Sequence, residues 1–175
     1  MADERERTFG EALLEELHWI HDVIRRDLRI VRELADGLAA GAPGADVAGR
    51  LRELETQGPL WQLKYGCLQY CRHVHGHHTF EDTAWFPGLR AANPALGGTL
   101  DRLQSEHRQV ADLLHEVEEA ASGLGTDGDA AARPRVVDAL RALDEHLHAH
   151  LAFEEEAIAP TLLELTVPPW MVPGQ

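Results

Sequence analysis

The stretch that decides the fold class is Val136–Ile158, which reads VVDALRALDEHLHAHLAFEEEAI. Apolar residues recur in it at intervals of three and four, a spacing that places them on one face of an α-helix. The positions that follow this spacing are Val136, Leu140, Leu143, Leu147, His150, Glu154 and Ile158. His150 and Glu154 are the polar members, and residues four apart lie on the same side of a helix. The stretch therefore predicts an amphipathic helix with a polar pair inside its apolar face.

Three further segments show the same spacing, whereas alternating patterns typical of strands do not occur. Breaks rich in glycine or proline separate the segments at residues 37–46, 57–61, 92–98 and 122–134. The first predicted face is Leu14, Leu17, His21, Ile24, Leu28, Val31 and Ala35. The second is Leu63, Cys67, Tyr70, Val74, His77, Glu81 and Ala84. The third is Leu100, Leu103, His107, Val110, Leu114, Val117 and Ala121.

Four amphipathic helices joined by short to medium links predict an all-α protein, an antiparallel four-helix bundle. An additional short helix is predicted over residues 47–56, between the first and second bundle helices. We predict one domain over residues 1–175, with the bundle over about 11–164 and a proline-rich tail over 165–175. The tail contains three prolines, which exclude an α-helix there, and Trp170 is expected to pack back on the bundle.

The composition is that of an ordinary globular protein, with 44% hydrophobic and 26% charged residues. The formal net charge of −14 repels phosphate backbones and argues against nucleic-acid binding. The charged N-terminus lacks the apolar core of a signal peptide, and the apolar runs are too short to span a membrane. A cytoplasmic protein without membrane contact is therefore expected. The two cysteines, Cys67 and Cys71, do not indicate a disulfide framework.

Polar residues interrupt all four apolar faces. They are His21, His77, Glu81, His107, His150 and Glu154. A buried carboxylate is costly unless it is paired or bound to a cation, and imidazole and carboxylate are good ligands for iron, manganese and zinc. A carboxylate can also bridge two metal ions roughly 3.5–4 Å apart. The pattern therefore predicts a dinuclear metal centre with four imidazole nitrogens and two bridging carboxylates, in preference to a metal-free bundle with buried histidines.

Four motifs along the chain resemble the hemerythrin-like, HHE cation-binding domains. They are HDVIRRDL from His21, HHTFEDTAWFP from His77, SEHRQVADLL around His107 and HLAFEEEAIAP from His150. The resemblance extends from about Leu13 to about Leu163 and implies a four-helix bundle with two non-heme iron ions. It implies His21, His77, His107 and His150 as terminal ligands and Glu81 and Glu154 as bridges. Manganese or zinc could replace iron, and Glu155 is the alternative for the second bridge.

This sequence departs from the oxygen-carrying hemerythrins at Ala111, where they have a second histidine on the third helix. The departure predicts fewer protein nitrogens and more open coordination, which favours reaction with peroxide, dioxygen or NO over reversible oxygen carriage. The leading expectation is a di-iron oxidoreductase that consumes or activates peroxide or dioxygen in defence against oxidative or nitrosative stress. The alternatives are a non-catalytic sensor or store of O₂, NO or iron, and a structural bundle stabilised by metal.

Residues beside the predicted faces are expected to support the ligands or to face water. Candidates for a supporting role are His18, Tyr70, His73, His115 and His146. The sequence predicts His75, His78 and His148 either at the solvated surface or in supporting positions behind the ligands. Asp82 and Glu155 are predicted either to face water or to orient ligands. The sequence leaves the oligomeric state open.

Overall fold

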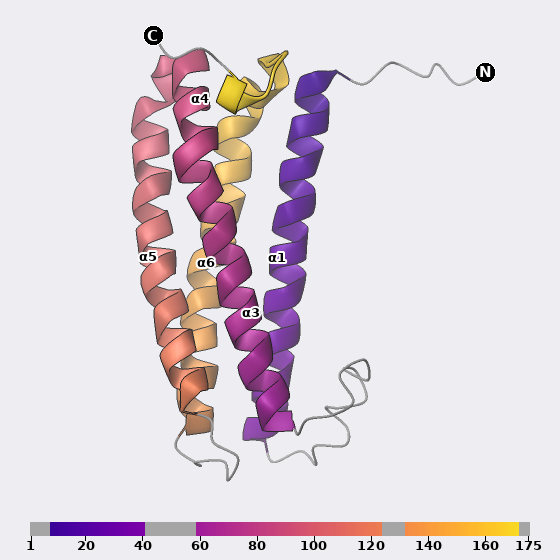
Figure 1. Cartoon of the computed structure of the whole chain (residues 1–175), viewed down its shortest axis with the longest axis vertical. Helices are drawn as coiled ribbons and strands as arrows, with labels where there is room; N and C mark the ends of the chain where they lie inside the picture. Colours follow the sequence, from indigo (N-terminus) through magenta and orange to yellow (C-terminus); the bar gives the residue numbers. More distant parts are fainter. Residues whose placement is uncertain (1–7, 41–58, 124–131, 172–175) are drawn as a thin grey trace, which may run out of the picture. The chain divides into compact units, whose positions relative to one another are not determined.

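The computed structural model describes residues 8–40, 59–123 and 132–171, and all regular structure within them is helical. Four long helices dominate (Figure 1), which confirms the all-α prediction. They are α1 (Phe9–Ala39), α3 (Pro59–Phe80), α5 (Gly97–Ser122) and α6 (Ala132–Glu164). The short helix predicted over residues 47–56 falls outside the described residues. Within the described ranges, none of the helices has the length and apolar character that crossing a bilayer requires.

Three short elements connect α3 to α5. They are the π-helical segment η1 (Glu81–Trp85), helix α4 (Phe86–Ala92) and the 3-10 turn η2 (Pro94–Leu96). The π-helical segment continues α3 without a break, since Phe80 and Phe86 on either side both keep right-handed helical angles. Asn93 ends α4 by leaving the helical conformation, and its side chain accepts a hydrogen bond from the Ala95 N–H. The break predicted over residues 92–98 is therefore a capped turn around Asn93.

The chain forms two compact units, each containing segments of all four long helices. Unit 1 comprises Met1–Val23, Gly76–His107 and Ala149–Gln175. Unit 2 comprises Ile24–His75 and Arg108–His148. All six predicted metal ligands belong to unit 1.

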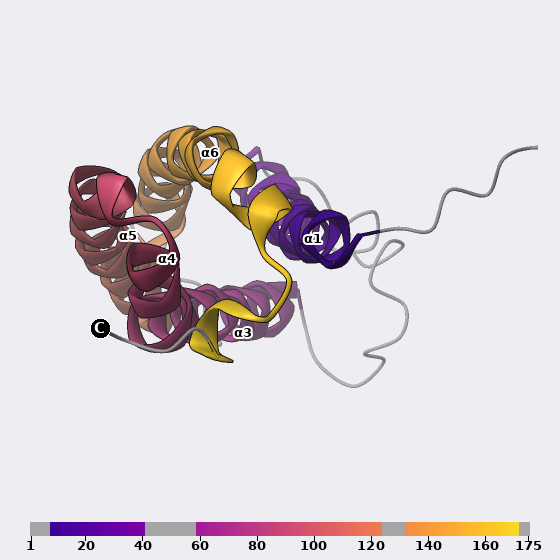
Figure 2. The same ribbon diagram turned by 90° about the horizontal axis from the view of Figure 1, so that it is seen from above.

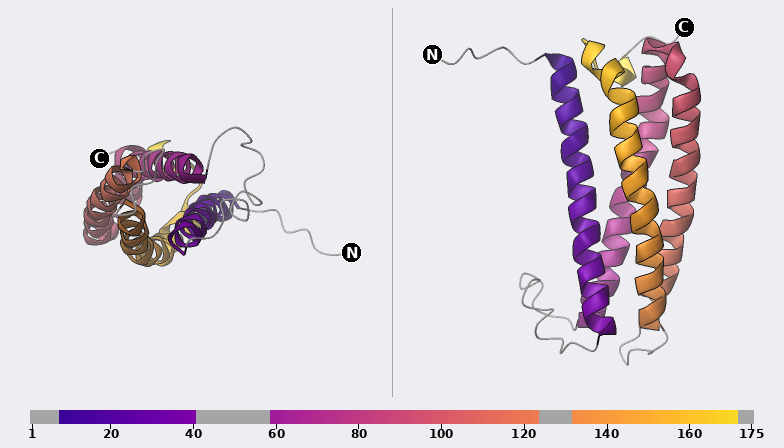
Figure 3. Two further views of the ribbon diagram at one scale, coloured as in Figure 1. Left: turned by 90° about the horizontal axis from the view of Figure 1, so that it is seen from below. Right: turned by 180° about the vertical axis from the view of Figure 1, so that it is seen from behind.

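Unit 1 contains an apolar cluster, formed by Leu13, Leu17, Trp85, Phe86, Leu89, Leu100, Leu103, Ile158, Leu162 and Leu165. The N-terminal part of α1 lies beside the C-terminal part of α6 (Figure 3, right), where a Cβ on Gly10 would come within 2.4 Å of the Leu162 carbonyl oxygen. The C-terminal turn η3 (Pro169–Met171) lies against α4 (Figure 2), where a Cβ on Gly88 would meet the Pro169 carbonyl. Only glycine fits at these two close approaches. As expected for the tail, the Trp170 ring packs back, 5.6 Å from the Phe80 ring centroid.

Buried apolar side chains and polar contacts between helices stabilise unit 2. Cys67 and Cys71 are buried free thiols, as expected of small core residues, and the Cys71 thiol donates to the Leu114 carbonyl at 3.6 Å. Burial raises the pKa of Cys67 to about 12, so the thiol stays neutral. Arg32 of α1 forms an ion pair with Asp144 of α6.

The predicted apolar faces of the third and fourth helices are confirmed, because every residue named for them is buried. On the first helix the buried face begins at Leu13, and Leu14 is only partly buried. On the second, Trp85 is buried and the predicted Ala84 is only partly so. The i→i+5 hydrogen bond from the Phe86 N–H to the Glu81 carbonyl widens the helix there and changes which residues face inward. The Leu63 side chain lies outside the described residues.

Candidate metal centre

Seven buried or nearly buried donor side chains gather in two groups in unit 1. The first group is His21, His77, Glu81 and Glu154, and the second is His78, His107 and His150. Within each group, one ligand atom from every member lies within 4.8 Å of the others. The groups contain all six ligands predicted from the sequence and add His78.

Local helix geometry explains how these side chains meet. His77 and His78 occupy the last turn of α3, and Glu81 opens the π-helical segment, a local irregularity that is frequent at functional sites. His150 and Glu154 are one turn apart on α6, so both point to the same side. His21 comes from α1, and His107 comes from α5. The donors thus come from all four long helices and from the π-helical segment.

The two glutamates face both groups. Glu81 Oε1 lies 3.2 Å from His77 Nε2, and Glu81 Oε2 lies 3.6 Å from His107 Nε2. Glu154 Oε2 lies 3.6 Å from His21 Nε2 and 3.7 Å from His150 Nε2. Two ligands of one ion, each roughly 2.0–2.2 Å from it, can be separated by such distances. Each glutamate therefore lies within reach of an imidazole from both groups, an arrangement that fits one cation at each group with the carboxylates between them.

The donors bury polar atoms that the protein itself does not satisfy. Glu81 is 2% exposed and Glu154 is 0% exposed. Among the described residues, the carboxyl oxygens of Glu81 and Glu154 have no hydrogen-bond partner outside this pair, and the Nε2 atoms of His78, His107 and His150 have none. Leaving one such atom unsatisfied costs about 1–3 kcal/mol, and a buried charge costs more. A bound cation would remove this cost at every one of these atoms.

Burial also sets the protonation of the donors when no metal is bound. Burial, together with the neighbouring charge of Glu154, raises the pKa of Glu81 well above its ordinary value. Burial likewise raises the pKa of Glu154 to about 8. Burial lowers the pKa of His150 to about 4 and also lowers the pKa of His107 and of His78. The imidazoles of His78, His107 and His150 are therefore neutral, with lone pairs ready for a metal, while the glutamates hold protons that a cation would displace.

Three carboxylates outside the groups fix the orientation of the imidazoles. His21 Nδ1–H donates to Glu155 Oε1 at 2.8 Å, and His107 Nδ1–H donates to Asp82 Oδ1 at 2.9 Å. His150 Nδ1–H donates to Glu106 Oε2 at 3.0 Å. A carboxylate on Nδ1 selects the tautomer that leaves the Nε2 lone pair free, which is the usual arrangement behind a metal-bound histidine.

The same contacts place these acidic residues at different distances from the donor groups. Glu154 lies within the donor group, whereas Glu155 binds the outer nitrogen of His21. Asp82 orients His107 and does not simply face water. Glu106 was missed, although it directly precedes His107 in the sequence. Partial burial of Glu106 favours its protonated form. The hydrogen bonds that its carboxylate accepts from His150 and Arg102 outweigh this effect, so the pKa of Glu106 is below its ordinary value.

The structure does not bring the residues predicted for supporting roles into the donor groups. His18 is exposed, and His115 is exposed and pairs with Glu119, because both occupy helix positions beside the apolar face. Tyr70, His73 and His146 belong to unit 2. Tyr70 is buried and lines a surface pocket of about 410 Å³ together with His73. Asp82, Glu106 and Glu155 contact the donor imidazoles instead.

Of the two positions predicted for His78, the solvated one is excluded, because the side chain is buried. Only 5% of it is exposed, and its ring stacks on that of His107, with centroids 4.1 Å apart and planes 10° apart. Its ring also meets the edge of His150, at 5.2 Å. The apolar face of α3 is wide enough to include a second row, formed by Cys67, Cys71, Val74, His78, Glu81 and Trp85. This row has the same spacing of three and four, and it could have revealed His78.

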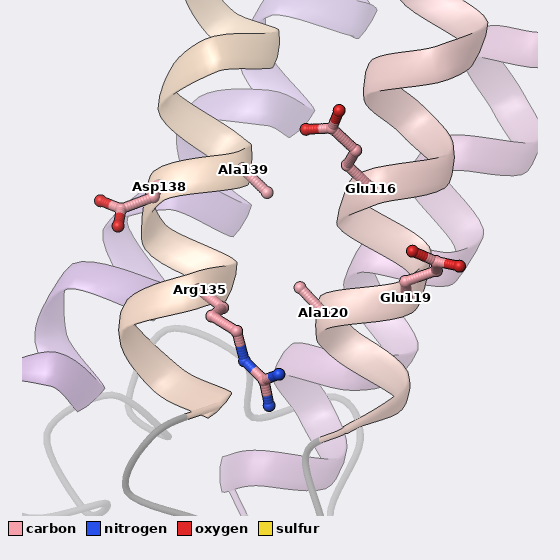
Figure 4. Close-up of a pocket in the computed structure, with 6 residues that line it drawn as sticks. All are labelled: Glu116, Glu119, Ala120, Arg135, Asp138 and Ala139. Atoms are coloured by element: carbon pink, nitrogen blue, oxygen red, sulfur yellow. The ribbon is translucent and has the colours of Figure 1, made fainter.

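A second surface pocket lies between α5 and α6 in unit 2, with a volume of about 430 Å³ (Figure 4). It is lined by Glu116, Glu119, Ala120, Arg135, Asp138 and Ala139. Neither this pocket nor the one beside Tyr70 is lined by any of the seven donors. The candidate centre is a cluster of side chains that are buried or nearly buried.

Comparison with known families agrees with this geometry. The family model described as the hemerythrin HHE cation binding domain matches residues 12–162. The chain belongs to this family. No curated protein and no solved structure gives a significant match. Membership in the hemerythrin HHE family supports cation binding, and the buried imidazoles and carboxylates of this chain fit that role.

Proposed function

We propose that the chain holds two iron ions at the buried donor groups and reacts there with small oxidants, namely peroxide, dioxygen or NO. The observation that carries the proposal is the position of Glu81, whose two oxygens face imidazoles of different groups. His21 and His77 would bind one ion, and His107 and His150 would bind the other. Glu81 and Glu154 would bridge them. Manganese or zinc could occupy the same donors, since all three metals accept imidazole and carboxylate.

When bound, a pair of iron ions supplies the two electrons that a two-electron oxidant such as peroxide requires. The protein contributes imidazoles held in one orientation by Asp82, Glu106 and Glu155. Phe86 packs against the His107 ring at 5.3 Å and provides an apolar wall. The donor side chains are almost completely shielded from solvent, which favours ligands of a few atoms over organic substrates.

Peroxide consumption is the first activity to measure. Disproportionation converts two molecules of hydrogen peroxide into two of water and one of dioxygen, so it needs no external reductant. The iron-loaded, desalted protein should release dioxygen from peroxide in proportion to its bound iron. His77→Ala should remove most of this activity, whereas the exposed control His18→Ala should retain it. Reversible dioxygen binding over many cycles without peroxide consumption would instead support a binder or sensor.

The carboxylates behind the imidazoles should influence metal affinity. We expect Glu106→Gln to weaken metal binding by roughly 10–100-fold, because glutamine is a weaker acceptor for His150 Nδ1–H and makes the imidazole less basic. Competition with a coloured chelator measures this affinity. The matched control is Glu116→Gln, an exposed position on the same helix. Equal affinities in the two variants would show that Glu106 does not act through His150.

A further inference from the structure

We propose that His78 is a fifth histidine ligand, which completes a set of three imidazoles with His107 and His150 on one of the two ions. This inference rests on the proposed function, since it assigns a further donor to the same centre. Nothing in the sequence pattern of the family motifs singled His78 out, and its assignment comes from its position in unit 1.

The helix directs the two adjacent histidines of α3 to different groups. Successive residues of an α-helix are rotated by about 100° around its axis. The His77 ring accordingly lies 5.2 Å from the His21 ring, and the His78 ring lies 4.1 Å from that of His107 and 5.2 Å from that of His150. The ligand nitrogens of His78, His107 and His150 lie within 4.8 Å of one another. One ion could therefore contact all three.

Packing alone does not explain a histidine at this position. The stack on His107 accounts for the burial of the ring, but a phenylalanine ring would stack without burying a polar atom. His78 Nε2 is buried and has no hydrogen-bond partner among the described residues, which is costly in a metal-free core. A metal ion would make use of the nitrogen that packing leaves unsatisfied.

The assignment changes what Ala111 implies. The nitrogen that Ala111 does not provide from α5 is supplied from α3 by His78, so the centre has five imidazoles. His78, His107 and His150 with two bridging carboxylates give one ion five protein donors, whereas His21 and His77 give the other four. The more open coordination, and with it the position for an incoming ligand, is then on the ion held by His21 and His77.

The test compares iron content in His78→Phe, His78→Glu and the exposed control His73→Ala. After loading with ferrous iron and gel filtration, the wild type and His73→Ala should hold about two ions per chain. His78→Phe keeps an aromatic ring for the stack but removes the donor, so it should retain about one ion. His78→Glu supplies a carboxylate donor and should recover most of the second. Circular dichroism checks the fold, and His78→Gln replaces His78→Phe if that variant does not fold.

Two outcomes separate this inference from the proposed function. Two ions in both the wild type and His78→Phe, held with equal affinity, would overturn the role of His78 and leave the dinuclear centre intact. No bound iron in the wild type would overturn the proposed function and the role of His78 together. One ion in His78→Phe and two in His78→Glu would establish His78 as a ligand.

Discussion

Replacing Glu81 and Glu154 together by glutamine should reduce bound iron from about two ions per chain to almost none. These residues supply all the carboxylate oxygens of the two donor groups, and each faces imidazoles from both. A neutral amide neither balances the charge of a divalent cation nor bridges two ions well. Elemental analysis after gel filtration measures the loss. The matched control is Glu156→Gln, an exposed position two residues after Glu154, which should leave the iron content unchanged.

The same double variant should be more stable than the metal-free wild type. Burial raises the pKa of Glu154 to about 8, so folding at neutral pH requires this carboxyl to take up a proton or bury a charge. One pKa unit corresponds to 1.36 kcal/mol, and glutamine removes this cost while burying an amide. We expect a gain of roughly 2–3 kcal/mol at pH 7, or a midpoint about 5–10 °C higher. A variant that keeps its iron, or an apo variant less stable than apo wild type, would contradict a metal role for the two glutamates.

Removing metal with a chelator should lower the thermal midpoint by about 15–30 °C at pH 8. A ligand present at about 1,000 times its Kd adds about 4 kcal/mol of stability, and two sites add up. Each kcal/mol corresponds to about 2–4 °C in a chain of this size. The stability is lost because the buried carboxylates of Glu81 and Glu154 are no longer neutralised by a cation once the metal is removed.

This loss should depend on pH in a defined direction. The pKa of Glu154 is about 8 in the folded chain and 4.5 in the unfolded chain. Its contribution to the stability of the folded apo protein is therefore present below pH 4.5 and lost as the pH rises through 8. The pKa of His150 is about 4 in the folded chain, below its ordinary value of 6.5. Its contribution to the stability of the folded apo protein is therefore present above pH 6.5 and lost as the pH falls through 4. The apo protein should therefore be most stable near pH 6.5 and lose stability towards pH 8.5.

The metal-loaded protein should behave differently over the same range. Metal displaces the protons of Glu81 and Glu154, so binding strengthens as the pH rises and the holo midpoint should not fall between pH 6.5 and 8.5. The gap between holo and apo midpoints should widen accordingly, as scanning calorimetry at several pH values would show. An apo midpoint that is constant or rises over this range would mean that the glutamates are not buried as described.

Much of the fold and of the candidate centre could be predicted because the buried face of a helix appears in the sequence as apolar residues spaced three and four apart. The spacing of apolar residues identified the buried faces of α5 and α6 residue by residue. A histidine or glutamate inside such a face is conspicuous, which is how His107, His150 and Glu154 were found. Their burial can be predicted from their place in the apolar spacing of a single helix, without knowing which helices pack against it.

What could not be predicted depends on contacts between distant segments. The partner of His21 is Glu155, 134 residues away, and the partner of His150 is Glu106, 44 residues away. Periodicity places each of these carboxylates beside an apolar face, but only the packing of the helices shows which imidazole it meets. His78 was missed for a related reason, because the buried side of α3 is wide and one narrow row of positions did not represent it.

If the two groups of donors form one dinuclear centre, anomalous diffraction from crystals of the iron-loaded protein should locate both ions. Data collected on both sides of the iron absorption edge should show two peaks, roughly 3.5–4 Å apart, each in contact with Glu81 and Glu154. One peak should lie beside His21 and His77, and the other beside His107 and His150. A single peak at one group, or no peak at either, would contradict the dinuclear centre.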